Sequence, residues 1–151
     1  MKLLHGARGC YGQIFIKPCR TKVVKVFFNR ESEGKLRSDI EIVFNSEVAA
    51  YNIASNEREL ISYIPRFYGS VDVSDELNDT SIYYTDLAYE IDYIDGQFSP
   101  INGAMIDYDS TENVMNKFEA FGIDATDAAV TSANYKIIKV VDFKISEKRY
   151  K

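Results

Sequence analysis

The sequence is poor in the residues that build zinc sites: it has one histidine, His5, and two cysteines among 151 residues. Common zinc sites combine several histidine and cysteine ligands, so a zinc centre of the usual kinds is not expected. Cys10 and Cys19 are predicted to lie on adjacent strands, where a disulfide is geometrically feasible. Because nothing at the N-terminus resembles a secretory signal, we instead expect reduced thiols in a cytoplasmic protein.

Long apolar runs and an excess of positive charge are also missing. No stretch approaches the ~20 apolar residues that cross a bilayer, so no membrane span is expected. The formal net charge is −5, whereas a nucleic-acid-binding surface needs clustered Lys and Arg. What is present is a composition of 46% hydrophobic and 13% aromatic residues, which is typical of a folded chain rather than a disordered one. A chain of this length fits one structural unit.

The spacing of apolar and turn residues predicts an α+β fold. A helix is expected from residue 38 to about residue 55, with Ser38 as N-cap and Glu41 in the capping-box position. A second helix is expected from Ser110 to Phe121. β-branched, aromatic and alternating segments predict strands at residues 13–17, 22–28, 67–73, 81–94 and 135–143.

One carboxylate, Glu47, lies in the middle of the apolar stripe of the first predicted helix. Burying this carboxylate without a partner would be costly, so a cation beneath the helix is expected. Lys25 is the natural candidate, because it lies in a strand that is apolar on both faces. Two alternatives stay open: Lys25 extends to water from a sheet edge, or the helix is rotated so that Glu47 reaches solvent.

A glycine-bearing segment, residues 7–15 (ARGCYGQIF), precedes the strand of Lys25. By itself this segment is typical of a β-hairpin. Taken in chain order with the lysine strand and the glutamate helix, however, residues 7–96 resemble the N-terminal lobe of a protein kinase. Gly9 and Gly12 match the second and third glycines of the kinase glycine-rich loop, and Ala7 replaces the first.

The kinase resemblance implies a role for each of these groups. Gly9 and Gly12 would let the backbone approach the phosphates of ATP, and Glu47 would hold Lys25 on the α- and β-phosphates. Residues 89–96 (YEIDYIDG) look like the kinase hinge. There the resemblance makes Ile91 the gatekeeper and turns the backbone of Asp92 and Ile94 toward adenine, although a strand ending in an Asp-Gly turn needs no ligand. The expected antiparallel lobe with one helix covers residues 1–96.

Residues 97–151 are expected to form a reduced C-terminal lobe of the same kinase-like fold. Asp127 aligns with the catalytic base of kinases, but Ala125 stands where the family has histidine. The metal-binding asparagine of the family aligns with Ser132, and Asn134 is close by in the sequence.

A second carboxylate in this part aligns with the metal-binding aspartate of the kinase D-F-G motif. Asp142 and Phe143 match the motif, whereas Lys144 replaces its glycine. The resemblance implies that Asp142 binds Mg²⁺, with Asn134 as the remaining candidate ligand. Only nine residues follow Asp142 in this sequence, which leaves no room for the activation segment and peptide-binding helices of a full kinase. Three alternatives stay open: a minimal kinase-like protein, a fragment, or a fold that kept the nucleotide lobe for another purpose.

The sequence supports two functional hypotheses. In the first, a kinase-like protein with an ATP-binding cleft has impaired or absent phosphotransfer and acts through a protein partner, as a regulator, an inhibitor or an immunity-type module. In the second, the protein is a minimal ATP- and Mg²⁺-dependent kinase that uses Lys25, Glu47, Asp127 and Asp142. The alternative fold is an unrelated α+β domain in which Lys25 and Glu47 form a structural ion pair.

Overall fold

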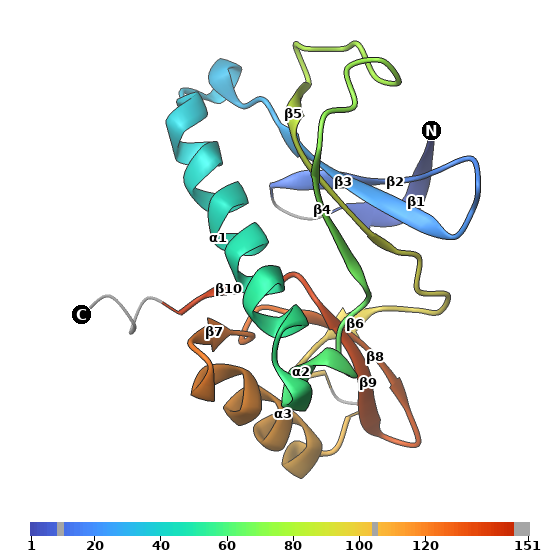
Figure 1. Cartoon of the computed structure of the whole chain (residues 1–151), viewed down its shortest axis with the longest axis vertical. Helices are drawn as coiled ribbons and strands as arrows, with labels where there is room; N and C mark the ends of the chain where they lie inside the picture. The colour runs from blue at the N-terminus through green and yellow to red at the C-terminus, as the bar shows by residue number, and fades with distance from the viewer. Residues whose placement is uncertain (9–10, 104–105, 147–151) are drawn as a thin grey trace. The chain divides into compact units, whose positions relative to one another are not determined.

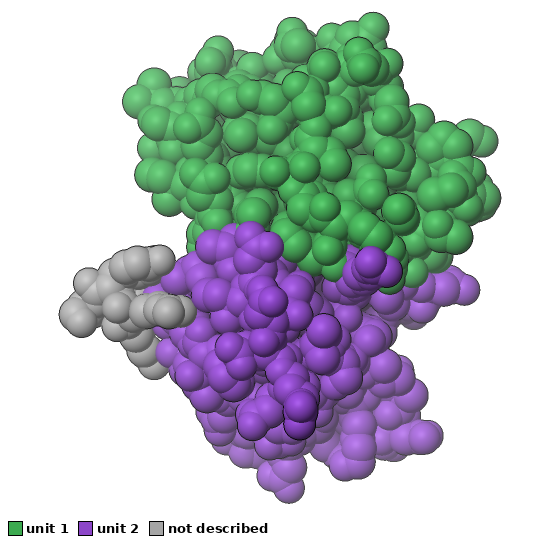
Figure 2. Space-filling model, viewed as in Figure 1, with its two compact units in different colours: residues 1–48, 67–93 green, residues 49–66, 94–151 purple. Residues whose placement is uncertain are grey.

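The computed structural model describes residues 1–8, 11–103 and 106–146. The chain is mixed α+β, with an antiparallel sheet and few helices (Figure 1). It divides into two compact units, namely residues 1–48 with 67–93, and residues 49–66 with 94–151 (Figure 2). The boundary after residue 93 is close to the predicted one after residue 96, but residues 49–66 belong to the second unit rather than to the first.

Unit 1 is built on a five-stranded antiparallel sheet with the strand order β1-β2-β3-β5-β4. Its strands are β1 (Lys2–Arg8), β2 (Gly12–Ile16), β3 (Lys22–Phe28), β4 (Phe67–Val71) and β5 (Tyr83–Asp92), and a 3₁₀ turn, η1 (Glu31–Glu33), follows β3. The central strand β3 is buried from its second residue onward. This burial agrees with its β-branched and aromatic composition, which suits a strand covered on both faces.

Helix α1 (Arg37–Ser55) begins one residue before the predicted N-cap, Ser38. Its first turn is capped by the carboxylate of Asp39, which accepts a hydrogen bond of 3.0 Å from the backbone N–H of Leu36. The acid at the third helical position therefore satisfies a free N–H group, as in one half of a capping box. The sequence predicted this arrangement around Ser38 and Glu41, whereas in the structure it involves Leu36 and Asp39 and the helix begins at Arg37.

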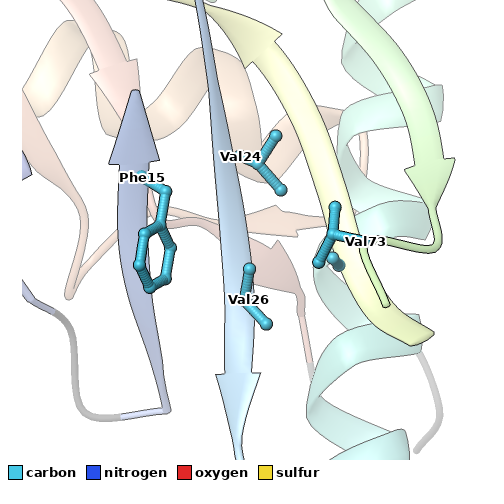
Figure 3. Packing of buried hydrophobic residues seen from close by; sticks show 5 residues of the cluster. Phe15, Val24, Val26 and Val73 are labelled. Atoms are coloured by element: carbon cyan, nitrogen blue, oxygen red, sulfur yellow. The ribbon is translucent and has the colours of Figure 1, made fainter. Parts of the chain in front are cut away.

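The sheet of unit 1 is covered by apolar contacts on both faces. On one face, Phe27 of β3 packs edge-on against Phe44 of α1, with ring centroids 5.4 Å apart. On the other face lies a separate buried cluster of Phe15, Val24, Val26, Val73 and Ala88 (Figure 3). Because side chains alternate along a strand, Lys25 shares the face of Phe27, which is the face covered by α1.

Unit 2 contains the end of α1, two further helices and two small antiparallel sheets. Its elements are α2 (Arg58–Ile61), β6 (Ser99–Pro100), α3 (Tyr108–Ala120), β7 (Ile123–Asp124), β8 (Ala129–Ala133), β9 (Lys136–Val141) and β10 (Lys144–Ile145). Strands β6, β8 and β9 form one sheet in that order, and β7 pairs with β10. Helix α3 has Asp107 as its N-cap residue rather than the predicted Ser110, whose hydroxyl accepts a hydrogen bond from the N–H of Ile137.

Aromatic side chains form the centre of unit 2. The ring of Phe143 lies 4.4 Å from that of Tyr51 and 5.3 Å from that of Phe118, measured between centroids. All three side chains are fully buried. Within the described part of the chain, no helix has the length and apolar content that a membrane crossing requires.

Candidate functional site

The predicted ion pair between Lys25 and Glu47 is present in unit 1. Strand β3 and helix α1 bring Nζ of Lys25 to 2.8 Å from Oε1 of Glu47. The two residues are 4% and 6% exposed, so both charges are removed from water. Removing either partner would leave a buried charge unpaired, which is strongly unfavourable. The ammonium group of Lys25 is therefore held at a defined position on the face of the sheet that α1 covers.

Tyr89 completes this site, and sequence reasoning missed it. Its hydroxyl donates a hydrogen bond of 2.7 Å to Oε1 of Glu47, the same oxygen that binds Lys25. Tyr89 is the direct cross-strand partner of Lys25 in the β3–β5 register, which explains why both reach one carboxylate. One signal was available: a tyrosine in a buried strand usually finds a partner for its hydroxyl.

We expect Tyr89→Phe to lower the free energy of unfolding by about 1–2 kcal/mol, because a hydrogen bond to a buried carboxylate is lost while the ion pair remains. Urea denaturation measures this change. Tyr135→Phe is the matched control, since Tyr135 is more than half exposed and should change stability little. Equal stability of the Tyr89 variant and the wild type would show that this hydroxyl does not support the pair.

Gly12 lies against the side chain of Lys25. A Cβ atom added at Gly12 would come within 2.8 Å of the carbonyl oxygen of Val26 and within 3.1 Å of Cε of Lys25. Because the closest contact is with backbone, a side chain at this position would force strands β2 and β3 apart. Glycine is therefore required here for a close approach of backbone and lysine. The other predicted glycine, Gly9, lies outside the described residues.

The residues predicted to resemble a hinge lie at the end of β5 and just after it. Ile91 is buried in the strand, and Asp92 is its last residue. The carboxylate of Asp92 accepts a hydrogen bond of 2.6 Å from the hydroxyl of Tyr68. Ile94 is the first residue after unit 1 ends.

Unit 2 brings Asp127 and Asp142 to the same end of the β8–β9 hairpin. The register pairs Ala129 with Val141, so Asp142 directly follows the paired end of β9 and Asp127 precedes the paired end of β8. The backbone of Asp142 is left-handed, with φ of 62°. Among residues other than glycine, aspartate and asparagine adopt this conformation most readily.

Asn134, predicted as a second metal ligand, lies at the opposite end of the same hairpin. It occupies the turn between β8 and β9, with φ of 52°. Strand β9, which has 6 residues, separates this turn from Asp142, and at about 3.3 Å per residue it spans roughly 20 Å. One metal ion cannot contact both side chains across this distance.

The connection that contains Asp127 is a tight turn of residues 125–128 between β7 and β8. Its ends are joined by a hydrogen bond of 3.1 Å from the N–H of Ala128 to the carbonyl of Ala125. The carboxylate of Asp124 accepts hydrogen bonds from both the N–H and the hydroxyl of Thr126. Asp127 is exposed on this turn. Ser132, which aligned with the kinase asparagine, lies within β8.

Comparison with family models, curated proteins and solved structures found no match. In the described ranges of the chain, no three His, Cys, Asp or Glu side chains gather in a way that could hold a metal ion by themselves.

Cys19 is a free, exposed thiol in the turn between β2 and β3. The hydroxyl of Thr21 lies 3.2 Å from its sulfur and donates a hydrogen bond to it. This hydrogen bond is the main cause that lowers the pKa of the Cys19 thiol below its ordinary value. Cys10 lies outside the described residues.

Proposed function

We propose that the protein is a kinase-like nucleotide-binding protein, with impaired or absent phosphotransfer, that acts through a protein partner. The observation that carries this proposal is the buried Lys25–Glu47 pair beneath Gly12. In protein kinases a strand lysine and a helix glutamate form such a pair, which places the ammonium group on the phosphates of ATP. The order of strands and helix in unit 1 agrees with that resemblance.

Lys25 is the group that would recognise phosphate. Glu47 restricts its side chain and is itself held by the hydroxyl of Tyr89, so little conformational entropy remains to be lost when a ligand binds. Gly12 has no side chain, which leaves its backbone free to approach phosphate oxygens near the ammonium group. These features support an anion site at this place in unit 1.

The carboxylates of unit 2 fit the kind of coordination that Mg²⁺ uses with nucleotides. Mg²⁺ is commonly held by one or two carboxylates together with substrate phosphates and water, so a cluster of three protein ligands is not needed. Asp142 and Asp127 share one end of the β8–β9 hairpin, and Asp142 is the proposed ligand. When bound, Mg²⁺ would neutralise charge on the phosphates. Asn134 is left out of the proposed metal site because of its position.

The turn of residues 125–128 is the reason to propose impaired chemistry. In kinases the catalytic base lies on a loop that also supplies a histidine and a metal-binding asparagine. Here Ala125 is buried at the start of a hydrogen-bonded turn, and β8 begins at Ala129. The turn of Asp127 therefore lacks the histidine and the metal-binding asparagine of the kinase loop. A kinase-like protein with this turn is better suited to binding than to transfer.

The alternative, a minimal active kinase, is favoured by one observation. Asp127 and Asp142 lie at the same end of one hairpin, as a base and a metal ligand would. The two proposals share the nucleotide site and differ in whether the γ-phosphate is transferred.

Titration calorimetry with ATP, with and without Mg²⁺, tests the nucleotide site. We expect Mg²⁺ to strengthen ATP binding, and Asp142→Asn to remove that gain, roughly tenfold or more in Kd, because a charged ligand is lost. Asparagine tolerates the left-handed backbone of Asp142, so this variant should fold normally. Asp75→Asn, at an exposed position outside the proposed site, is the control with the same change in charge.

Absence of ATP binding at millimolar concentration, with or without Mg²⁺, would overturn the proposed nucleotide site. Radiolabelled ATP then separates the two proposals. Transfer of label that is lost in Asp127→Ala would establish the minimal kinase, and binding without transfer would support the impaired form.

A further inference from the structure

An open groove lies in unit 2, and none of its lining residues has been discussed so far as a nucleotide or metal ligand. It has a volume of about 870 Å³ and is lined by Asn52, Ile53, Asn56, Glu57, Glu119, Ala120, Phe121, Gly122 and Ser146. These residues come from the end of α1 and the residues after it, from the end of α3 and the residues after it, and from the residue after β10.

The electrostatics of this groove favour a positively charged ligand. Two helix C-termini, those of α1 and α3, end at its wall, and each presents the negative end of a helix dipole. The carboxylates of Glu57 and Glu119 add two negative charges, and no basic residue is among the described lining residues. The last turn of α1 has no basic residue, while Lys117 of α3 lies over the ring of Tyr63 instead.

The groove also has an apolar part. Ile53, Ala120 and Phe121 line it beside the charged and amide groups. A volume of 870 Å³ is within the range of about 300–1,000 Å³ in which proteins bind small ligands. The groove is therefore large enough to hold a few side chains of an extended segment, and too small to hold the face of a globular domain.

We propose that this groove binds a short basic segment of a partner protein. Arginine or lysine side chains of the segment pair with Glu57 and Glu119, and an apolar side chain packs against Ile53 and Phe121. The inference deepens the partner half of the proposed function by naming its surface and chemistry. It does not depend on nucleotide, so peptide binding and ATP binding can fail separately.

Fluorescence anisotropy with a labelled peptide of sequence LRRLRRL tests the groove at about 0.15 M ionic strength, where the Debye length is roughly 8 Å. We expect saturable binding by the wild type, and binding weakened about tenfold by Glu57→Gln with Glu119→Gln, because two charge pairs are lost. Glutamine keeps an acceptor for the hydroxyl of Ser146, which bonds Glu119 in the structure, so the fold should be unaffected. Circular dichroism and thermal unfolding check this directly.

The net charge of −5 would attract any basic peptide weakly, and a control variant removes that ambiguity. Asp109→Asn with Glu112→Gln removes the same charge from the opposite part of α3, and Glu112 lies about 10 Å from Glu119 along the helix axis. This control should change Kd less than about twofold, because screening is strong beyond that distance.

Other ligands distinguish the proposed segment from a general cation. Peptide GRRGRRG, which has the charges but no leucine, should bind more weakly than LRRLRRL because it lacks the apolar contact. Equal losses in the groove variant and the control variant would overturn the proposal. So would spermine binding that is as sensitive to Glu57 and Glu119 as LRRLRRL binding, or the absence of any peptide binding at millimolar concentration.

Discussion

Replacing Lys25 with methionine is expected to lower the free energy of unfolding by about 3–5 kcal/mol, because it leaves the Glu47 carboxylate buried without its counter-charge. For a chain of this length that loss corresponds to a fall in Tm of roughly 10 °C. Glu47 is 6% exposed, so it cannot recover its hydration without unpacking α1 from the sheet. Tyr89 would still donate to Glu47, but one neutral hydrogen bond does not replace an ammonium group. Urea denaturation and thermal unfolding measure the effect.

The double variant Lys25→Met with Glu47→Gln tests more directly whether the two residues act as a pair. It removes both charges and keeps an acceptor for the hydroxyl of Tyr89, so we expect it to be more stable than either single variant. Each single change should cost several kcal/mol, and the double change about 1–2 kcal/mol. Additive losses would show that the two residues act independently, which is incompatible with the 2.8 Å contact.

An exposed ion pair of the same unit provides the control. Arg37 lies 2.6 Å from a carboxylate oxygen of Asp86, whose side chain is half exposed. The hydrogen bond from Arg37 lowers the pKa of Asp86, so the pair is formed at neutral pH. Even so, Asp86→Asn should cost at most about 1 kcal/mol, because exposed pairs are screened by water. The difference between the stability losses of Lys25→Met and Asp86→Asn then measures how much burial adds to the cost of breaking an ion pair.

Phe143→Ala is expected to destabilise unit 2 by about 3–5 kcal/mol, because it removes a buried ring and leaves a cavity. Phe143 is 1% exposed and lies between the rings of Tyr51 and Phe118. Phe143→Leu fills part of that space and should cost clearly less. Native-state hydrogen exchange places the loss in unit 2 if amides of α3 lose protection while those of β3 keep it.

The control for this experiment is Phe98→Ala, at a ring that is partly exposed in the same unit. It should change stability by less than about 1 kcal/mol. An equal effect of the two substitutions would mean that the rings around Phe143 are not the centre of the packing. Reduced protection of β3 in the Phe143 variant would show that the two units unfold together.

The parts of the structure that the sequence predicted well are those with strong periodicity. The segment of residues 22–28 forms β3 with the same bounds, because β-branched and aromatic residues on both faces suit a central strand. The apolar stripe around Glu47 predicted a buried carboxylate and a cation beneath it, and the structure contains that pair. Both features depend on burial, and buried positions of a helix or strand are marked in the sequence by the pattern of apolar residues.

Features that depend on register or on short connections could not be predicted in the same way. The contact of Tyr89 with Glu47 follows from the β3–β5 pairing, which no local pattern encodes. The turn of residues 125–128 and strand β8 after it contain too few residues for a periodic signal. For this reason the choice of Asn134 as a metal ligand, made because it is close to the aligned Ser132 in sequence, did not anticipate its position at the far end of the hairpin.

The single oxygen that joins Lys25 and Tyr89 to Glu47 has an evolutionary consequence. A lineage that loses the lysine first passes through an unstable intermediate, and so does one that loses the glutamate first. We therefore expect positions 25 and 47 to change to neutral residues nearly together, because either change alone leaves a buried charge unpaired. In a homologue that keeps lysine at position 25, we expect glutamate at position 47, because the requirement comes from burial of the pair and not from any ligand.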